Sequence, residues 1–183
     1  MNYKKSRDLS WEILIKNNVS SLPVNIIELC RNMNITVKYY ISSDDNDGQS
    51  MILRGKPIIF VNRNCNLQRQ RFTVAHELGH ILLGHVGKYK LVNREPSPND
   101  NPIEHEANIF ASRLLAPACV LWGCNVQNAD EISKLCGISR QAAEYRLKRM
   151  QELYTRNKFL ISPLERQVYA QFTDFIFKHK NYD

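Results

Sequence analysis

The chain has 183 residues, of which 43% are hydrophobic, and a formal net charge of +7. This length predicts one domain, or one domain with a small appendage, and it allows a substantial apolar core. No segment approaches the ~20 consecutive apolar residues of a membrane-spanning helix, and the polar N-terminal residues predict no secretory signal. Five cysteines without a CxxC pair indicate free thiols in a reducing compartment. We therefore expect a cytoplasmic globular protein with no membrane partner.

The first third of the chain mixes helical and strand-like patterns. Apolar residues at helical spacing predict two short helices, and the β-branched and aromatic run ITVKYYI predicts a strand. Two further apolar runs on either side of Gly55 predict a hairpin, and the polar run before them predicts a loop. The expected elements are a helix over 7–18, a helix over 23–32, a strand over 35–41, a loop over 42–50 and a hairpin over 51–61.

The remainder of the chain is mainly helical. The segment 67–83 contains no proline and is strongly apolar, so it predicts a largely buried helix. The polar, proline-containing segment 86–101 predicts a surface loop, and a second strong helix is expected over 102–115. Two or three further helices are expected after residue 128. Together with the strands, these helices predict an α+β fold.

The sequence HELGH at residues 76–80 carries the strongest functional signal. Two histidines four positions apart lie on the same face of a helix, so both neutral rings can bind one Zn²⁺. The intervening Glu77 can accept a proton from a water on the metal. Burying these polar side chains in an apolar helix is costly unless something compensates them, and a metal does so. The pattern predicts a zinc metalloprotease with His76 and His80 as ligands and Glu77 as the catalytic base.

Two histidines make a weak zinc site, so a third protein ligand should come from elsewhere. The three-histidine arrangement HExxHxxGxxH fails, because Leu83 and Val86 occupy the positions three and six residues after His80. His85 has the wrong helical phase and is not expected to be a ligand. The third ligand must therefore lie outside the motif helix.

The helix expected over 102–115 offers acidic side chains for this role. Advancing roughly 100° per residue ranks them by their distance from the central apolar stripe of the helix. Glu104 ranks first, Glu106 second and His105 a distant third. Asn108 lies one turn after Glu104 on the same side, so it is well placed to hold a histidine ring by a hydrogen bond.

Two blocks of the sequence resemble the ImmA/IrrE family of zinc metallopeptidases. The blocks are RFTVAHELGH at 71–80 and EHEANIFA at 104–111, and the resemblance covers about residues 10–150. The resemblance implies three zinc ligands and one catalytic base in this chain. These are His76, His80 and Glu104 as ligands and Glu77 as the base.

The resemblance also implies a fold and a substrate. It implies a thermolysin-like (gluzincin) core in which the motif helix packs beside a small β-sheet. We expect residues 1–120 to form this core and residues 121–183 to form a helical segment packed on it. Such proteins resemble regulators of mobile elements or stress responses, which cleave a helix-turn-helix repressor and so relieve repression. The expected partner is therefore a protein substrate of this kind.

Residues 130–150 show the pattern helix, glycine turn, helix, which resembles a helix-turn-helix. Arg140, Arg146 and Arg149 are candidate contacts for nucleic acid or a protein partner, although Arg146 takes a position that is usually apolar in DNA-binding versions. Basic helices are common without DNA binding, so DNA is the less favoured partner. The alternative function is a DNA-binding or toxin-antitoxin-type regulator whose zinc site is not proteolytic.

Overall fold

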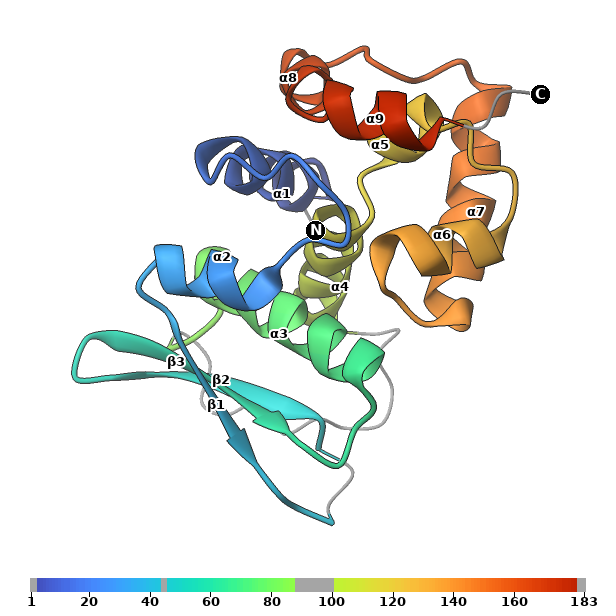
Figure 1. Cartoon of the computed structure of the whole chain (residues 1–183). Helices are drawn as coiled ribbons and strands as arrows, with labels where there is room; N and C mark the ends of the chain where they lie inside the picture. Colours follow the sequence, from blue (N-terminus) through green and yellow to red (C-terminus); the bar gives the residue numbers. More distant parts are fainter. Residues whose placement is uncertain (1–2, 44–45, 88–100, 181–183) are drawn as a thin grey trace. The chain divides into compact units, whose positions relative to one another are not determined.

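The computed structural model describes residues 3–43, 46–87 and 101–180 (Figure 1). The chain divides into two compact units, the first comprising Met1–Arg7 and Asn25–Ala111, the second Asp8–Val24 and Ser112–Asp183. Two helices, α1 (Tyr3–Lys16) and α4 (Pro102–Leu115), begin in the first unit and end in the second. The expected division of the chain at residue 120 stays a prediction, because compactness alone does not define which segments fold together.

The first unit contains a three-stranded mixed sheet. Strands β1 (Thr36–Tyr40), β2 (Gly48–Leu53) and β3 (Lys56–Asn62) form it in the order β1-β3-β2. The central β3 pairs parallel with β1 and antiparallel with β2. The hairpin turns at Arg54 and Gly55, whose φ angles of 50° and 76° are positive, as a tight two-residue turn requires. The predicted hairpin and the α+β class are confirmed.

Strand β2 begins at Gly48, earlier than the predicted start at Met51. The polar composition of this segment predicted a loop, but Gly48 pairs with Val61 of β3. A Cβ atom at Gly48 would lie 2.5 Å from the backbone oxygen of Phe60 and 2.5 Å from Thr73 Cγ2. Glycine therefore allows β2 to approach both β3 and the helix packed on the sheet.

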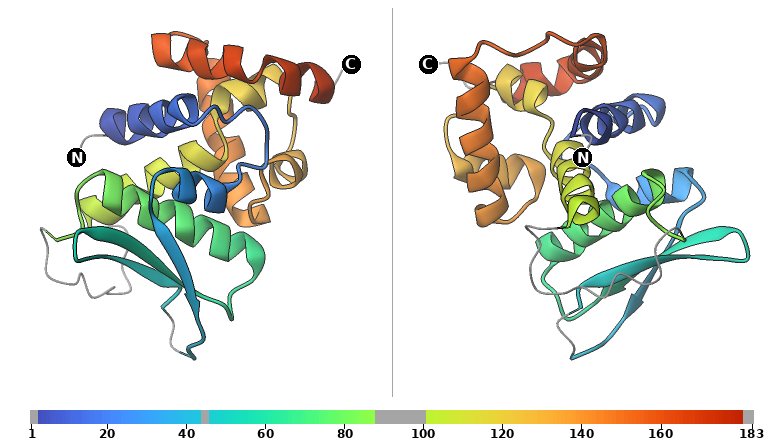
Figure 2. Two further views of the ribbon diagram at one scale, coloured as in Figure 1. Left: turned by 60° about the vertical axis from the view of Figure 1, so that its left-hand side comes forward. Right: turned by 180° about the vertical axis from the view of Figure 1, so that it is seen from behind.

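Helices α2 (Ile26–Asn32) and α3 (Leu67–Leu82) pack against the sheet, as both views of Figure 2 show. The Asn25 side chain caps α2 by accepting a hydrogen bond from the Glu28 N–H at 3.2 Å. This cap starts α2 after Pro23, where the sequence predicted the helix to begin. Asn66 caps α3 in the same way, and the predicted motif helix is confirmed.

Helix α4 approaches α3 closely at Gly79. A Cβ atom there would lie 3.0 Å from Phe110 Cδ1 and 3.3 Å from Ala107 Cα. Ala107 and Phe110 are both fully buried, so neither has free space to move into. The missing side chain at position 79 therefore sets the distance between the two helices.

The second unit is helical in the part of the chain that the structure describes. Its remaining helices are α5 (Ala118–Gly123), α6 (Ala129–Cys136), α7 (Arg140–Thr155), α8 (Pro163–Gln171) and α9 (Thr173–His179). The short α5 was not expected, because Pro117 predicted a stop, whereas Pro117 occupies the N-cap position from which α5 begins. Helices α6 and α7 are joined through Gly137, whose φ of 62° is left-handed, so the segment shows the pattern of helix, glycine turn and helix. None of the described helices is long and apolar enough to cross a membrane.

Arg146 on α7 lies in the interior of the second unit, with only 2% of its surface exposed. Among the described residues, its three guanidinium nitrogens have no hydrogen-bond partner. Burial lowers the pKa of Arg146 well below its usual value, and the cations of Arg113 and Arg149 lower it further. The expectation that Arg146 contacts nucleic acid or a partner is therefore corrected, because its side chain does not reach the surface.

Replacing Arg146 by methionine should stabilise the protein. A buried cation without a counter-charge is costly, and an apolar side chain of similar length removes that cost, so we expect the free energy of unfolding to rise by about 1–4 kcal/mol. Urea denaturation measures the change. Arg140→Met is the matched control, because Arg140 is exposed and its ion pairs contribute little. If Arg146→Met were less stable than the unaltered protein, the guanidinium of Arg146 would have a favourable interaction, contrary to our reading of its surroundings.

Gly79→Ala should destabilise the first unit. In an unrestrained helix this change stabilises by roughly 1 kcal/mol, because alanine has the higher helix propensity. Here the new methyl group would press on Phe110 and on the backbone of Ala107, so we expect a net loss of about 1–2 kcal/mol in urea denaturation. A more stable variant would show that α4 can move away from α3 at little cost.

Candidate metal centre

Helix α3 brings the two motif histidines together. His76 and His80 are buried, at 5% and 8% exposure. Their Nε2 atoms lie 2.9 Å apart, and their rings meet edge to face with centroids 4.6 Å apart. The helical spacing thus directs both Nε2 atoms to one point, as expected from the sequence.

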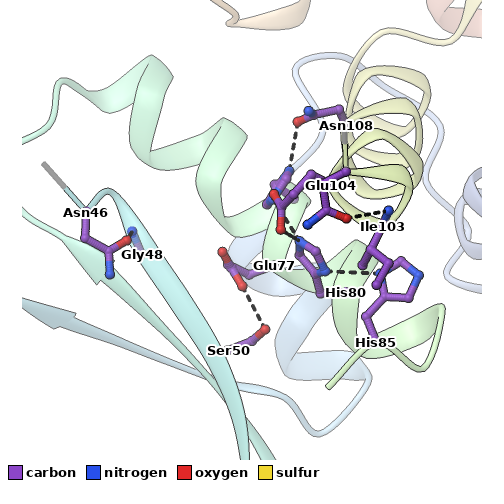
Figure 3. Close-up of polar contacts among 11 residues, drawn as sticks. Asn46, Gly48, Ser50, Glu77, His80, His85, Ile103, Glu104 and Asn108 are labelled. Carbon is purple, nitrogen blue, oxygen red and sulfur yellow. Dashed lines mark hydrogen bonds and ion pairs between the residues drawn. The ribbon is translucent and has the colours of Figure 1, made fainter. Parts of the chain in front are cut away.

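Helix α4 adds Glu104 to this pair. Its Oε2 atom lies 3.1 Å from His76 Nε2, and its Oε1 atom lies 3.3 Å from His80 Nε2. The close contacts with the rings of His76 and His80 hold the pKa of the Glu104 carboxyl well below its usual range. Figure 3 shows Glu104 reaching from α4 toward His80. Of the three residues ranked on this helix, Glu104 is the one that the structure places with the histidines.

The donor set fits a tetrahedral metal ion. One ligand atom from each of the three residues lies within 4.8 Å of the other two. The two Nε2 atoms are 2.9 Å apart, the one of His76 lies 3.1 Å from one Glu104 oxygen, and the one of His80 lies 3.3 Å from the other. Bonds of about 2.0–2.1 Å at tetrahedral angles place ligand atoms roughly 3.3 Å apart, so only small shifts are needed. Two imidazoles and a carboxylate are ordinary ligands of zinc and of related divalent ions.

Asn108 orients the ring of His76. The His76 Nδ1 atom lies 2.9 Å from Oδ1 of Asn108. Asn108 is one turn after Glu104 on α4, and Figure 3 labels both residues. Because an amide oxygen only accepts hydrogen bonds, Nδ1 carries the proton and donates it. The lone pair of His76 Nε2 is then directed at the shared point. This is the hydrogen-bond partner expected for Asn108.

His85 and Glu106 form a second outer contact, which the sequence did not predict. The Nδ1 atoms of His80 and His85 lie 3.1 Å apart, and His85 Nε2 lies 3.4 Å from Glu106 Oε2. Desolvation is the largest effect on the His85 pKa, which is lowered, and the neighbouring His80 acts in the same direction. His85 thus contacts the Nδ1 side of His80, and Glu106 contacts His85, so neither residue belongs to the cluster of His76, His80 and Glu104. His105, the third-ranked candidate, packs edge-on against Tyr3, with ring centroids 5.1 Å apart.

Glu77 projects from α3 toward strand β2. Its side chain is buried, at 5% exposure, and its Oε2 atom accepts a hydrogen bond of 2.7 Å from the hydroxyl of Ser50 (Figure 3). Sequence reasoning missed Ser50, because it placed this residue in a polar loop. No motif links a serine to a glutamate 27 residues later.

The remaining predicted contacts, Arg140 and Arg149, lie on α7 in the second unit. Arg140 bonds to Asp130 at 2.7 Å and to Glu144 at 3.2 Å. Arg149 pairs with Glu152. Acidic side chains of the same helix pair therefore partner both cations.

Comparison with known proteins finds similarity to peptidases. Residues 28–148 match the model of a peptidase family described as the IrrE N-terminal-like domain. A curated protein named Metallopeptidase ImmA from Bacillus subtilis (strain 168) is 33% identical over 94 residues, which is 50% of this chain and 53% of that protein. The chain thus spans about half the length of this relative.

The family match covers both blocks that carry the site, the HELGH helix and the segment from Glu104 to Asn108. It also extends over more than half of the sequence, from within α2 to within α7. The chain therefore belongs to the peptidase family of the IrrE N-terminal-like domain.

Proposed function

We propose that this chain is a zinc-dependent endopeptidase. The observation that carries the proposal is the convergence of His76 Nε2, His80 Nε2 and the Glu104 carboxylate. Three protein ligands leave a coordination position open, which is typical of catalytic and not of structural zinc sites. Membership of a peptidase family and likeness to a protein named Metallopeptidase ImmA support the proposal. We also propose a thermolysin-like (gluzincin) core for residues 1–120, with residues 121–183 as an appended helical segment.

We assign each residue around the site a separate role in peptide hydrolysis. Zinc, when bound, supplies a Lewis acid that acidifies a water and polarises the scissile carbonyl. Glu77 acts as general base, accepting the proton of the attacking water and delivering it to the leaving amine. Asn108 holds the ring of His76 and His85 holds the ring of His80, so both Nε2 atoms stay directed at the point that a metal would occupy.

We propose a helix-turn-helix transcriptional repressor as the protein substrate, cleaved in the cytoplasm to relieve repression in a mobile element or stress response. The likeness of residues 71–80 and 104–111 to ImmA/IrrE proteins supports this substrate. The free state of all five cysteines suits a reducing compartment.

The placement of the arginines in the helix-turn-helix segment disfavours the alternative, a DNA-binding regulator with a non-proteolytic zinc site. Direct readout of DNA needs exposed cations or amides on the second helix. Arg146 is buried, whereas Arg140 and Arg149 are paired with acidic neighbours. None of these three arginines is thus both exposed and without an acidic partner, as a contact to DNA would require.

Glu77→Gln should abolish cleavage and retain the metal. Glutamine keeps the size and hydrogen-bonding capacity of the side chain but cannot accept the proton of the attacking water. The assay mixes the purified, zinc-loaded protein with purified helix-turn-helix repressors from its own genome, and follows cleavage by electrophoresis and mass spectrometry. Zinc content is measured by elemental analysis and should stay equimolar with the chain.

Full activity of Glu77→Gln would refute the role of Glu77 as base. If the unaltered zinc-loaded protein leaves the repressors intact and instead binds operator DNA, the alternative function is correct.

Asn108→Ala should weaken zinc binding without removing a ligand. Loss of the bond to Nδ1 frees the His76 ring to rotate and to adopt the wrong tautomer, so we expect affinity to fall by roughly 10- to 100-fold. Competition with a chromogenic chelator measures the dissociation constant. The matched control is Asn64→Ala, an exposed asparagine whose amide bonds to the Ser42 carbonyl. Equal affinities of Asn108→Ala and the unaltered protein would contradict the orienting role.

A further inference from the structure

We propose that Ser50 is a positioning residue for Glu77, and this proposal rests on the proposed function of Glu77 as base. The Ser50 hydroxyl donates a hydrogen bond of 2.7 Å to Glu77 Oε2. A hydroxyl that donates to a carboxylate forms a charge-assisted bond, which is shorter and stronger than a bond between neutral groups. Ser50 acts through Glu77 and is not itself a catalytic residue.

The contact is built into the packing of β2 on α3. Gly48 and Ser50 lie two positions apart on the same face of the strand, and Thr73 and Glu77 lie four positions apart on the same face of the helix. Two strand residues rise about 6.6 Å and four helical residues rise about 6.0 Å, so the two pairs match in spacing. Gly48 therefore packs against Thr73, and two residues later Ser50 reaches Glu77, one helical turn further along α3.

The close approach at Gly48 makes the bond possible. A Cβ atom at this position would lie 2.5 Å from Thr73 Cγ2, so any other residue would push the strand away from the helix. With glycine there, the short serine side chain spans the remaining gap. On the other side of β2, pairing of Ser50 with Ile59 holds the strand in register.

A bond of this kind matters because glutamate is long and flexible. General base catalysis requires the carboxylate to be within hydrogen-bond reach of the proton that it removes. The Ser50 bond selects one orientation of a buried side chain before substrate arrives, which lowers the cost of reaching the reactive geometry. The sheet thereby orients the base, while α4 and the segment after α3 orient the metal-binding histidines.

The first test needs neither metal nor substrate. In the metal-free protein, Ser50→Ala, Glu77→Ala and the double variant form a thermodynamic cycle, read from the midpoint of urea denaturation. We expect Ser50→Ala to lower the midpoint when Glu77 is present and to leave it unchanged in the Glu77→Ala background. Equal shifts in the two backgrounds would overturn the proposal, because they would show that Ser50 does not interact with Glu77.

The second test uses a helix-turn-helix repressor that the unaltered protein cleaves. Ser50→Ala should lower kcat by about 10- to 100-fold and leave KM and zinc content unchanged, because it misdirects the base and touches neither metal nor substrate. Ser50→Thr keeps the hydroxyl and suits a strand, so it should restore most of the activity. Ser43→Ala, at an exposed serine before β2, is the control for loss of a hydroxyl.

The two tests separate the positioning role from the proposed function. Full kcat in Ser50→Ala, or failure of Ser50→Thr to exceed it, would overturn the positioning role. If the unaltered protein cleaves no repressor, the proposed substrate fails, while the metal-free cycle still decides whether Ser50 holds Glu77. Circular dichroism of each variant confirms that the fold is retained.

Discussion

The close approach of α4 to α3 at Gly79 is the constraint on which the rest of the site depends. Gly79 lies between the two motif histidines, and its missing side chain leaves room for Ala107 and Phe110 of α4. Glu104 precedes Ala107 by about one turn and Asn108 follows it directly. The close packing at Gly79 therefore places the Glu104 carboxylate beside the Nε2 atoms of His76 and His80. It also places the Asn108 amide beside Nδ1, on the other side of the His76 ring. A larger separation between the helices would remove both interactions at once.

Each polar side chain of the motif meets a partner from a different part of the first unit. His76 meets Asn108 of α4, His80 meets His85 after the end of α3, and Glu77 meets Ser50 of β2. Burying an imidazole or a carboxylate without such partners is costly, so these contacts explain how three ionisable groups persist in an apolar helix. They also fix orientation, since each partner restricts a side chain that would otherwise rotate. Stability and preorganisation of the site have the same physical source.

The sequence predicted those parts of the site that follow from helical periodicity. Spacing alone placed His76 and His80 together, and the phase of the second helix ranked Glu104 above Glu106 and His105. Ser50 could not be found in this way, because its contact depends on how closely a strand packs on a helix, which Gly48 and Thr73 decide. Local signals also failed where a side-chain cap overrides a proline, as at the start of α2, and where a short buried helix follows a proline, as at α5. The burial of Arg146 contradicts the ordinary preference of a charged residue for water.

The α6–α7 pair shows why backbone shape and function must be separated. Its two helices and left-handed Gly137 have the form of a helix-turn-helix, and its sequence is rich in arginine. Yet Arg140 bridges Asp130 and Glu144, so this cation links the two helices to each other. Arg149 is paired along its own helix, and Arg146 is inside. The three arginines of the segment are thus paired or buried, and a net charge of +7 for the chain does not by itself create a nucleic-acid surface.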